Sequence, residues 1–236
     1  MYVCLTFISE FLSTFSQIRE ALSSHLSHGS YENASPPFPL RFPPCSPVSP
    51  QASFHILVPP DSAHPGAGSF IIDNAFDEEF ITTLIDIFER IPVADAEKVS
   101  PNTRRYFSDT AGIVHAHITH VLSHFGKDGH IAFVHMRYLN YAEMGGSLAP
   151  HVDLARTDEK GLRSNFTFII YLTTCEEGGE TAIVTSLNYK DKDEEAGVLA
   201  KVRPMRGRLF VFPHLCPHEG CAVVDTPKLL LRGELS

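Results

Sequence analysis

The sequence predicts an α+β fold in which helices come first and a strand-rich half closes into a sandwich or barrel. Two amphipathic helical patterns lie between residues 77 and 125, and six short strand-like runs complete the chain after them. The composition of the 236 residues changes sharply only once, where a proline-rich stretch ends. Helices followed by a series of short strands are typical of an α+β domain.

The N-terminal segment, residues 1–66, is expected to precede the folded domain of residues 67–236. Residues 1–15 are apolar but interrupted by Glu10, and no Lys or Arg precedes this run, which makes it a poor signal peptide. A short amphipathic helix that continues through Ile18 and Leu22 is the alternative. Residues 36–65 hold ten of the 17 prolines, whose fixed φ and missing amide donors prevent helices and sheet ladders. We expect a flexible, partly extended tail there, with a proline-motif ligand for a partner domain as the alternative.

The elements of the domain follow from periodicity. Residues 69–73 predict a strand, and residues 77–92 predict a helix with Phe80, Leu84 and Phe88 along its buried face. A second helix is expected from about Gly112 to Phe125. The strands predicted after it are residues 131–141, 165–174, 180–186, 208–213, 220–224 and 228–235. The charged residues 190–197 are expected to form a solvated loop between strands.

Charge and cysteine content narrow the functional classes. The net charge of −9 gives no electrostatic reason to expect a nucleic-acid partner, so none is predicted. Five scattered cysteines do not make a disulfide scaffold, which favours a reducing compartment. Because no clear signal peptide and no membrane-spanning run is present, we expect a cytoplasmic or nuclear protein that does not contact a membrane.

A histidine and an aspartate two residues apart, His151 and Asp153, predict a metal site. Residues two apart point to the same side of a β-strand, so one imidazole nitrogen and one carboxylate oxygen are presented together. A third ligand would complete the facial triad of non-haem Fe(II) oxygenases. Two candidates follow the predicted strand 208–213, namely His214 and His218.

The last predicted strand carries a lysine, Lys228, in an otherwise apolar run. Residues 228, 230 and 232 share one face of that strand, and a buried lysine is costly unless an anion neutralises it. An anionic co-substrate that reaches from the metal to Lys228 would provide that anion.

The combination of these motifs resembles a known family. A His-x-Asp pair, then the residues GGET (178–181), then a histidine followed ten residues later by lysine, is similar to the prolyl 4-hydroxylase-like branch of the Fe(II)/2-oxoglutarate-dependent dioxygenases. The resemblance covers roughly Ser69 to the C-terminus. In that family the lysine holds the far carboxylate of 2-oxoglutarate, and because Lys228 lies ten residues after His218, the resemblance selects His218 over His214.

The resemblance implies a double-stranded β-helix (jelly-roll) core with N-terminal supporting helices. It implies Fe(II) held by the three ligands, 2-oxoglutarate and O2 as co-substrates, and ascorbate as reductant. It places the co-substrate contacts on Tyr141 and Tyr171. Tyr138 is a rival for Tyr141, because the two lie on opposite faces of one strand. The glycines of the GGET turn are expected to supply positive φ.

The implied activity is hydroxylation of a C–H bond in a peptide or protein substrate, most naturally at a prolyl side chain. A nucleic-acid oxidative demethylase of the same superfamily and a catalytically silent jelly-roll binding module are the alternatives. Departures from the family pattern are Pro227, which replaces a glycine, the long charged segment after GGET, and Arg232, which could compete with Lys228 for the carboxylate.

Two further groups of metal-binding residue types have simpler interpretations. Four histidines on the second helix (His115, His117, His120 and His124) are expected to form a polar flank, with adventitious metal binding as the alternative. Cys216 and Cys221 bracket His218 but lack a second cysteine pair, so we interpret them as packing residues rather than as zinc ligands.

Overall fold

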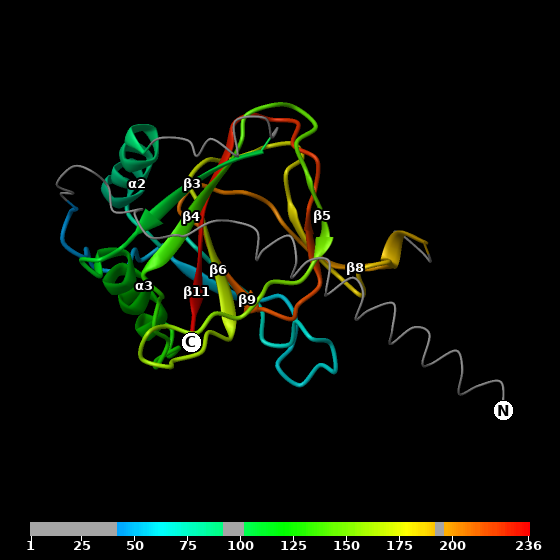
Figure 1. Cartoon of the computed structure of the whole chain (residues 1–236), viewed down its shortest axis with the longest axis horizontal. Helices are drawn as coiled ribbons and strands as arrows, with labels where there is room; N and C mark the ends of the chain where they lie inside the picture. The colour runs from blue at the N-terminus through cyan, green and yellow to red at the C-terminus, as the bar shows by residue number, and fades with distance from the viewer. Residues whose placement is uncertain (1–41, 92–101, 192–195) are drawn as a thin grey trace. The chain divides into compact units, whose positions relative to one another are not determined.

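The computed structural model describes residues 42–91, 102–191 and 196–236. Within them lie two antiparallel β-sheets, two α-helices and one short 3-10 helix (Figure 1). The elements in chain order are β1 (Ser53–Ile56), β2 (Phe70–Asp73), α2 (Glu78–Arg90), β3 (Asn102–Ser108), α3 (Ile113–His124), β4 (His135–Tyr141), β5 (Leu148–His151), β6 (Phe166–Tyr171), β7 (Thr181–Val184), η2 (Tyr189–Asp191), β8 (Val198–Val202), β9 (Leu209–Pro213), β10 (His218–Gly220) and β11 (Lys228–Leu235).

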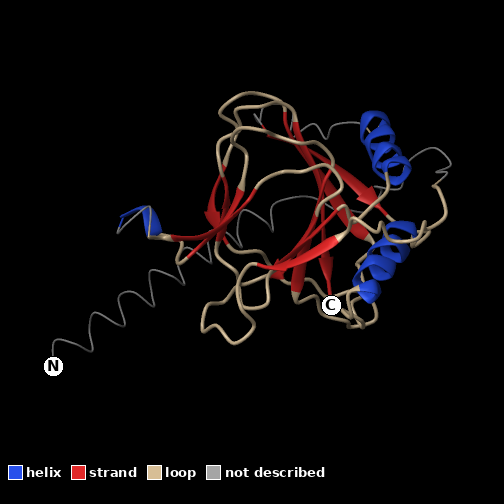
Figure 2. Cartoon of the chain, turned by 180° about the vertical axis from the view of Figure 1, so that it is seen from behind, coloured by secondary structure: helices blue, strands red, loops and turns tan. Residues whose placement is uncertain are grey.

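The two sheets form the jelly-roll that the resemblance predicts. The larger sheet has the strand order β1-β2-β9-β6-β11-β4-β3, and the smaller one has the order β5-β10-β7-β8. Neighbours in each sheet are mostly far apart in sequence, and all of the pairings are antiparallel. The two helices lie on the side of the large sheet away from the small one (Figure 2). The α+β prediction is therefore confirmed.

Alternation along the central strands divides the core into two parts. On β6, Phe168 and Ile170 face outward and pack in one cluster with the apolar stripes of α2 and α3. Ile169 and Tyr171 face inward, in a second cluster that also contains Ile183 of the small sheet. This two-residue period lets one strand serve both the helix layer and the jelly-roll interior. The interior cluster includes two residues of the site described below, Tyr141 and Tyr171.

Both predicted helices are present, and in each an aspartate near the N-terminus accepts hydrogen bonds from amides of the first turn. The Asp77 carboxylate accepts a hydrogen bond from the Phe80 amide (2.8 Å), which makes Asp77 the N-cap of α2. At α3, the Asp109 carboxylate accepts from the amides of Ile113 (2.9 Å) and His115 (3.0 Å). These carboxylates satisfy amides that have no partner within their own helix, and they lie at its positive end.

The prediction of a flexible tail is wrong for the described residues before Gly66. Ser53–Ile56 pairs with β2 as the edge strand of the large sheet, and Phe54 packs on Phe70 with ring centroids 5.0 Å apart. Residues 51–58 contain no proline, so their amides can join a ladder. Phe42 and Val48 pack against the helix-side core as well. The helix expected within residues 1–22 lies outside the described part of the chain.

One predicted strand is displaced, and four strands were not predicted. The predicted strand 220–224 is instead β10, which ends at Gly220, and Val223 makes only an isolated bridge to Gly178. The strands missing from the prediction are β1, β3, β5 and β8, which are short or strongly polar. None of the helices in the described ranges has the length and apolarity that crossing a bilayer requires.

Candidate active site

Three of the predicted ligands meet on the small sheet. His151 is the last residue of β5, Asp153 follows two residues later, and His218 is the first residue of β10. β5 and β10 pair with His151 opposite His218, which sets the two imidazole centroids 4.2 Å apart. The Asp153 Oδ2 atom lies 3.8 Å from His218 Nε2. Within the described residues, these are the only three His, Cys, Asp or Glu side chains whose ligand atoms all lie within 4.8 Å of one another.

Both imidazoles of this triad present a free nitrogen. His151 Nδ1 donates to the Ala149 carbonyl (2.8 Å), and His218 Nδ1 donates to the Cys216 carbonyl (2.9 Å). A carbonyl only accepts, so Nδ1 carries the proton and Nε2 keeps its lone pair. Burial and then the neighbouring His218 lower the pKa of His151 to about 4, and burial lowers the pKa of His218. Neutral imidazoles of this kind are ready to bind a metal.

The third ligand is held as a carboxylate. Burial alone would raise the pKa of Asp153, but the Arg232 guanidinium and the two imidazoles hold that pKa well below its ordinary value. The Arg232 Nη2 atom lies 2.5 Å from Asp153 Oδ1. Arg232 thus lies against the metal-ligand candidate, and the sequence hypothesis that it competes for the co-substrate carboxylate is not supported by this geometry.

His214, the rival ligand, is already fully engaged. Its Nδ1 lies 2.9 Å from the Thr167 hydroxyl and its Nε2 lies 2.8 Å from the Ser164 hydroxyl. The residue is 3% exposed and lies behind Asp153, whose amide donates to the His214 carbonyl (2.9 Å). The structure therefore brings His218 into the triad and leaves His214 outside it. The contacts of Ser164 and Thr167 were not predicted, because no local motif marks them.

Lys228 lies on the same inner surface, at the start of β11. It is 1% exposed, and within the described residues no carboxylate forms an ion pair with its ammonium. Its Nζ atom lies 4.7 Å from the centroid of the Tyr141 ring, in a cation–π contact. Burial lowers the pKa of Lys228 to about 8. A buried ammonium without an anionic partner is the feature that an anionic co-substrate would complete.

The register of β4 decides between the two rival tyrosines. Tyr141 is paired with Lys228 and belongs to the inner cluster, whereas Tyr138 belongs to the helix-side cluster and donates to the Leu84 carbonyl (3.0 Å). Tyr171 also faces inward and donates to Thr181 Oγ1 (2.8 Å). Burial raises the pKa of Tyr141 to about 12 and raises the pKa of Tyr171, so both hydroxyls remain protonated donors.

The GGET turn approaches Lys228 closely. Gly178 and Gly179 both have φ of +71°, the positive φ expected for this turn. A Cβ atom on Gly179 would lie 3.3 Å from Lys228 Cδ, and one on Gly178 would lie 2.7 Å from the Ala222 carbonyl oxygen. Side chains at these positions would therefore crowd the lysine and the loop before β11.

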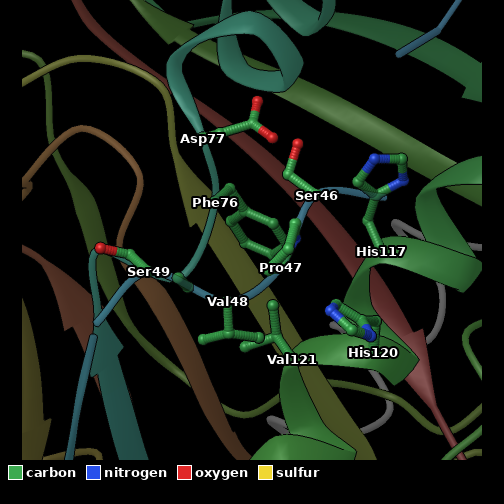
Figure 3. Close-up of a pocket in the computed structure, with 10 residues that line it drawn as sticks. Ser46, Pro47, Val48, Ser49, Phe76, Asp77, His117, His120 and Val121 are labelled. Carbon is green, nitrogen blue, oxygen red and sulfur yellow. The ribbon is translucent and has the colours of Figure 1, made fainter. Parts of the chain in front are cut away.

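One of the four α3 histidines departs from the expected polar flank: His120 and His124 are exposed and His115 is half-buried, but His117 is not on the surface. His117 is 6% exposed, stacks on Phe80 with ring centroids 4.0 Å apart, and donates from Nδ1 to the Ile113 carbonyl (2.8 Å). Its Nε2 atom has no hydrogen-bond partner among the described residues. His117 and His120 line a cavity of about 50 Å³ together with residues 46–49 and Asp77 (Figure 3).

The cysteines beside His218 also lack metal-site partners among the described residues. Cys216 is buried, and burial raises the pKa of its thiol to about 12. Cys221 is half-buried and packs in a small cluster with Tyr189 on the far side of the small sheet. Their geometry agrees with packing roles.

The residues of the site fit Fe(II) and 2-oxoglutarate. Two imidazoles and one carboxylate are the donor set of non-haem Fe(II) oxygenases, and their ligand atoms already lie within reach of one ion. The buried ammonium of Lys228 and the hydroxyl of Tyr141 lie on the neighbouring inner surface, where a dicarboxylate would find a cation and a donor.

Comparisons with known proteins agree with this geometry. The sequence model of the 2OG-Fe(II) oxygenase superfamily matches residues 136–233. No curated protein sequence gives a significant match.

Solved structures show the same fold. A viral collagen prolyl hydroxylase from Paramecium bursaria Chlorella virus-1 is 16% identical, with a TM-score of 0.50 over 74% of this chain and 98% of the viral one. HygX from Streptomyces hygroscopicus, with nickel and 2-oxoglutarate bound, is 12% identical, with a TM-score of 0.51 over 72% of this chain and 82% of HygX. Residues 136–233, which carry the triad and Lys228, thus match the 2OG-Fe(II) oxygenase superfamily, the family that the sequence resemblance indicated.

Proposed function

We propose that the protein is an Fe(II)- and 2-oxoglutarate-dependent dioxygenase that hydroxylates a C–H bond in a peptide or protein, at a prolyl side chain. The observation that carries this proposal is the triad of His151, Asp153 and His218 on the same inner surface as a buried, unneutralised Lys228. A silent binding module would have no use for two neutral imidazoles and a carboxylate arranged around one point.

The roles of the residues follow from their positions. His151 Nε2, His218 Nε2 and the Asp153 carboxylate would hold Fe(II), while Lys228 and Tyr141 would hold the far carboxylate of 2-oxoglutarate by charge-assisted contacts. When bound, iron, 2-oxoglutarate and O2 supply an oxidative decarboxylation to succinate and CO2 that drives hydroxylation of the substrate. The apolar inner cluster around Tyr171 excludes water from the co-substrate.

The triad is not equally accessible on all sides. His218 is 5% exposed and Asp153 is 8% exposed, whereas His151 is only half-buried. The side of the triad formed by His151, at the end of the edge strand β5, is therefore where a substrate side chain would enter.

The choice of a prolyl substrate is supported by likeness alone. The viral neighbour is a collagen prolyl hydroxylase, whereas HygX has been solved with hygromycin B, a small molecule. We propose a peptide substrate because the alignment with the viral enzyme includes 98% of the viral chain. We expect ascorbate to act as the reductant when turnover occurs without substrate.

The experiment that tests this proposal incubates the protein with Fe(II), ascorbate, 2-oxoglutarate and a library of proline-containing peptides. We expect succinate to form and one peptide class to gain a single oxygen by mass spectrometry. Succinate formation stimulated by methylated oligonucleotides, and not by any peptide, would instead favour a demethylase. No succinate with any substrate, in protein that binds neither metal nor 2-oxoglutarate, would favour the binding module.

A further inference from the structure

We propose that a buried hydrogen-bond chain, Ser164–His214–Thr167, together with Arg232, positions the Asp153 carboxylate for metal binding. None of these four residues belongs to the triad. The inference rests on the metal site of the proposed function and adds the residues that would orient its one anionic ligand.

The direction of the chain follows from the donors and acceptors it contains. Asp153 is a carboxylate and only accepts, so the Thr167 hydroxyl donates to Asp153 Oδ2 (2.6 Å). A hydroxyl has one proton, and therefore Thr167 Oγ1 accepts from His214 Nδ1 (2.9 Å). His214 Nε2 is then the acceptor for the Ser164 hydroxyl (2.8 Å).

The start of the chain is fixed as well. Ser164 Oγ accepts a hydrogen bond from the backbone amide of Arg156 (2.8 Å). A backbone N–H can only donate, so the direction of this first hydrogen bond is fixed. Each donor from Arg156 to Thr167 thus points toward Asp153. Hydrogen bonds aligned in one direction polarise one another, so the last donor is stronger than an isolated hydroxyl.

The other carboxylate oxygen is held by Arg232. Its Nη2 lies 2.5 Å from Asp153 Oδ1, while its Nη1 lies 3.1 Å from Glu234 on the same strand. With one oxygen bound to Thr167 and the other to Arg232, the carboxylate plane cannot rotate. Oδ2 is therefore held 3.8 Å from His218 Nε2.

Burial makes the arrangement rigid. Ser164 and Thr167 are both fully buried, His214 is 3% exposed and Arg232 is 7% exposed. In such surroundings each polar group keeps its partner, because breaking a bond leaves a buried donor or acceptor unsatisfied. This explains why His214 and Arg232, which have the residue types of a ligand and of a co-substrate anchor, serve neither role in this fold.

The decisive comparison is Thr167→Val against Thr167→Ser. Valine has the shape of threonine but lacks the donor to Asp153, whereas serine keeps the hydroxyl. We expect Thr167→Val to weaken Mn(II) binding, measured calorimetrically with 2-oxoglutarate present, by about 10- to 100-fold. Thr167→Ser should remain near the wild-type affinity.

Two further readouts separate positioning from a general loss of structure. The visible spectrum of the Co(II)-loaded protein reports ligand geometry, and we expect it to change in Thr167→Val and to be restored in Thr167→Ser. In turnover, Thr167→Val should lower kcat while the KM for 2-oxoglutarate stays near wild type, because Lys228 is untouched.

A second pair decides the question if Thr167→Val does not fold. His214→Leu removes the donor to Thr167, whereas His214→Asn can place an amide N–H near the position of Nδ1. We expect weak Mn(II) binding in the first variant and recovery in the second.

The outcomes distinguish the two proposals. Wild-type protein that binds no Mn(II) would overturn the metal site itself. Wild-type protein that binds Mn(II), with folded Thr167→Val or His214→Leu protein of the same affinity and the same Co(II) spectrum, would overturn the positioning role alone.

Discussion

Lys228 and Tyr141 are directly opposite each other on the paired strands β11 and β4, and the lysine ammonium lies 4.7 Å from the centroid of the tyrosine ring. The pairing brings together two residues 87 positions apart. The cation–π contact offsets part of the cost of burying the ammonium but leaves its charge unneutralised. This relationship is the basis of the first three predictions.

Lys228→Met should weaken the binding of 2-oxoglutarate without weakening the binding of the metal. A charge-assisted contact contributes about 1.5–3 kcal/mol, so the KM for 2-oxoglutarate should rise about 10- to 100-fold. Mn(II) affinity in the absence of 2-oxoglutarate should stay at the wild-type value. Lys201→Met, at an exposed lysine of β8, is the control. An unchanged KM in Lys228→Met would remove the lysine from the co-substrate site.

Binding of 2-oxoglutarate should depend on pH through Lys228. Because the pKa of the free side chain is lowered to about 8, the ammonium is present below that pH and is lost as pH rises through it. The dissociation constant should therefore be flat below pH 8 and rise about tenfold for each pH unit well above it.

Lys228→Arg should abolish this dependence, because a guanidinium stays protonated. Calorimetric titration of the Mn(II)-loaded protein at a series of pH values measures both proteins. A wild-type profile that stays flat through pH 9, like that of the arginine variant, would show that the charge on Lys228 does not hold the co-substrate.

Substitutions of the two rival tyrosines should have different effects, one on stability and the other on co-substrate binding. Tyr138→Phe removes the hydrogen bond to the Leu84 carbonyl and should lower the free energy of unfolding by about 1 kcal/mol, with no effect on the KM for 2-oxoglutarate. Tyr141→Phe should raise that KM and leave stability nearly unchanged. Chemical denaturation and succinate assays on both variants test these predictions. A raised KM in Tyr138→Phe with an unchanged KM in Tyr141→Phe would place the co-substrate on the helix side of β4 and contradict the assignment.

Gly179→Ala should affect the site through Lys228. Its Cβ would lie 3.3 Å from Lys228 Cδ, and the positive φ adds strain of about 1–2 kcal/mol. Gly161→Ala is a matched control, because Gly161 has φ of +82° but no heavy atom within 4 Å of the point where the added methyl group would lie. We expect both variants to lose similar stability in thermal unfolding, while only Gly179→Ala raises the KM for 2-oxoglutarate. Equal KM values would show that the turn does not constrain the lysine.

The sequence was most informative where chemistry depends on short spacing. His151 and Asp153 are two apart on one strand end, and Lys228 is selected by its distance from His218 and its apolar neighbours, so these residues could be named without a structure. The helices were predicted within two residues at each end, because their apolar stripes and the N-cap Asp77 are local signals. These features depend little on the rest of the fold.

The contacts missed by sequence reasoning depend on tertiary pairing. Thr167 lies behind Asp153 only because β6 runs beside β11, where Glu234 is its partner. The same pairing brings Arg232 to Asp153 rather than to a co-substrate. Strand β1 was not predicted because the proline-rich segments on both sides of it dominate the local composition. Its four residues nevertheless pair with β2 along their whole length.

The most direct test of the account is succinate formation from 2-oxoglutarate under Fe(II) and O2, compared between wild type, Asp153→Ala and His218→Ala. His55→Ala, at an exposed histidine of β1, is the control for general loss of a histidine. We predict succinate from wild type and His55→Ala and none from the two triad variants, provided that all four proteins melt cooperatively. Equal succinate formation in folded Asp153→Ala and His218→Ala would contradict the assignment of the metal centre.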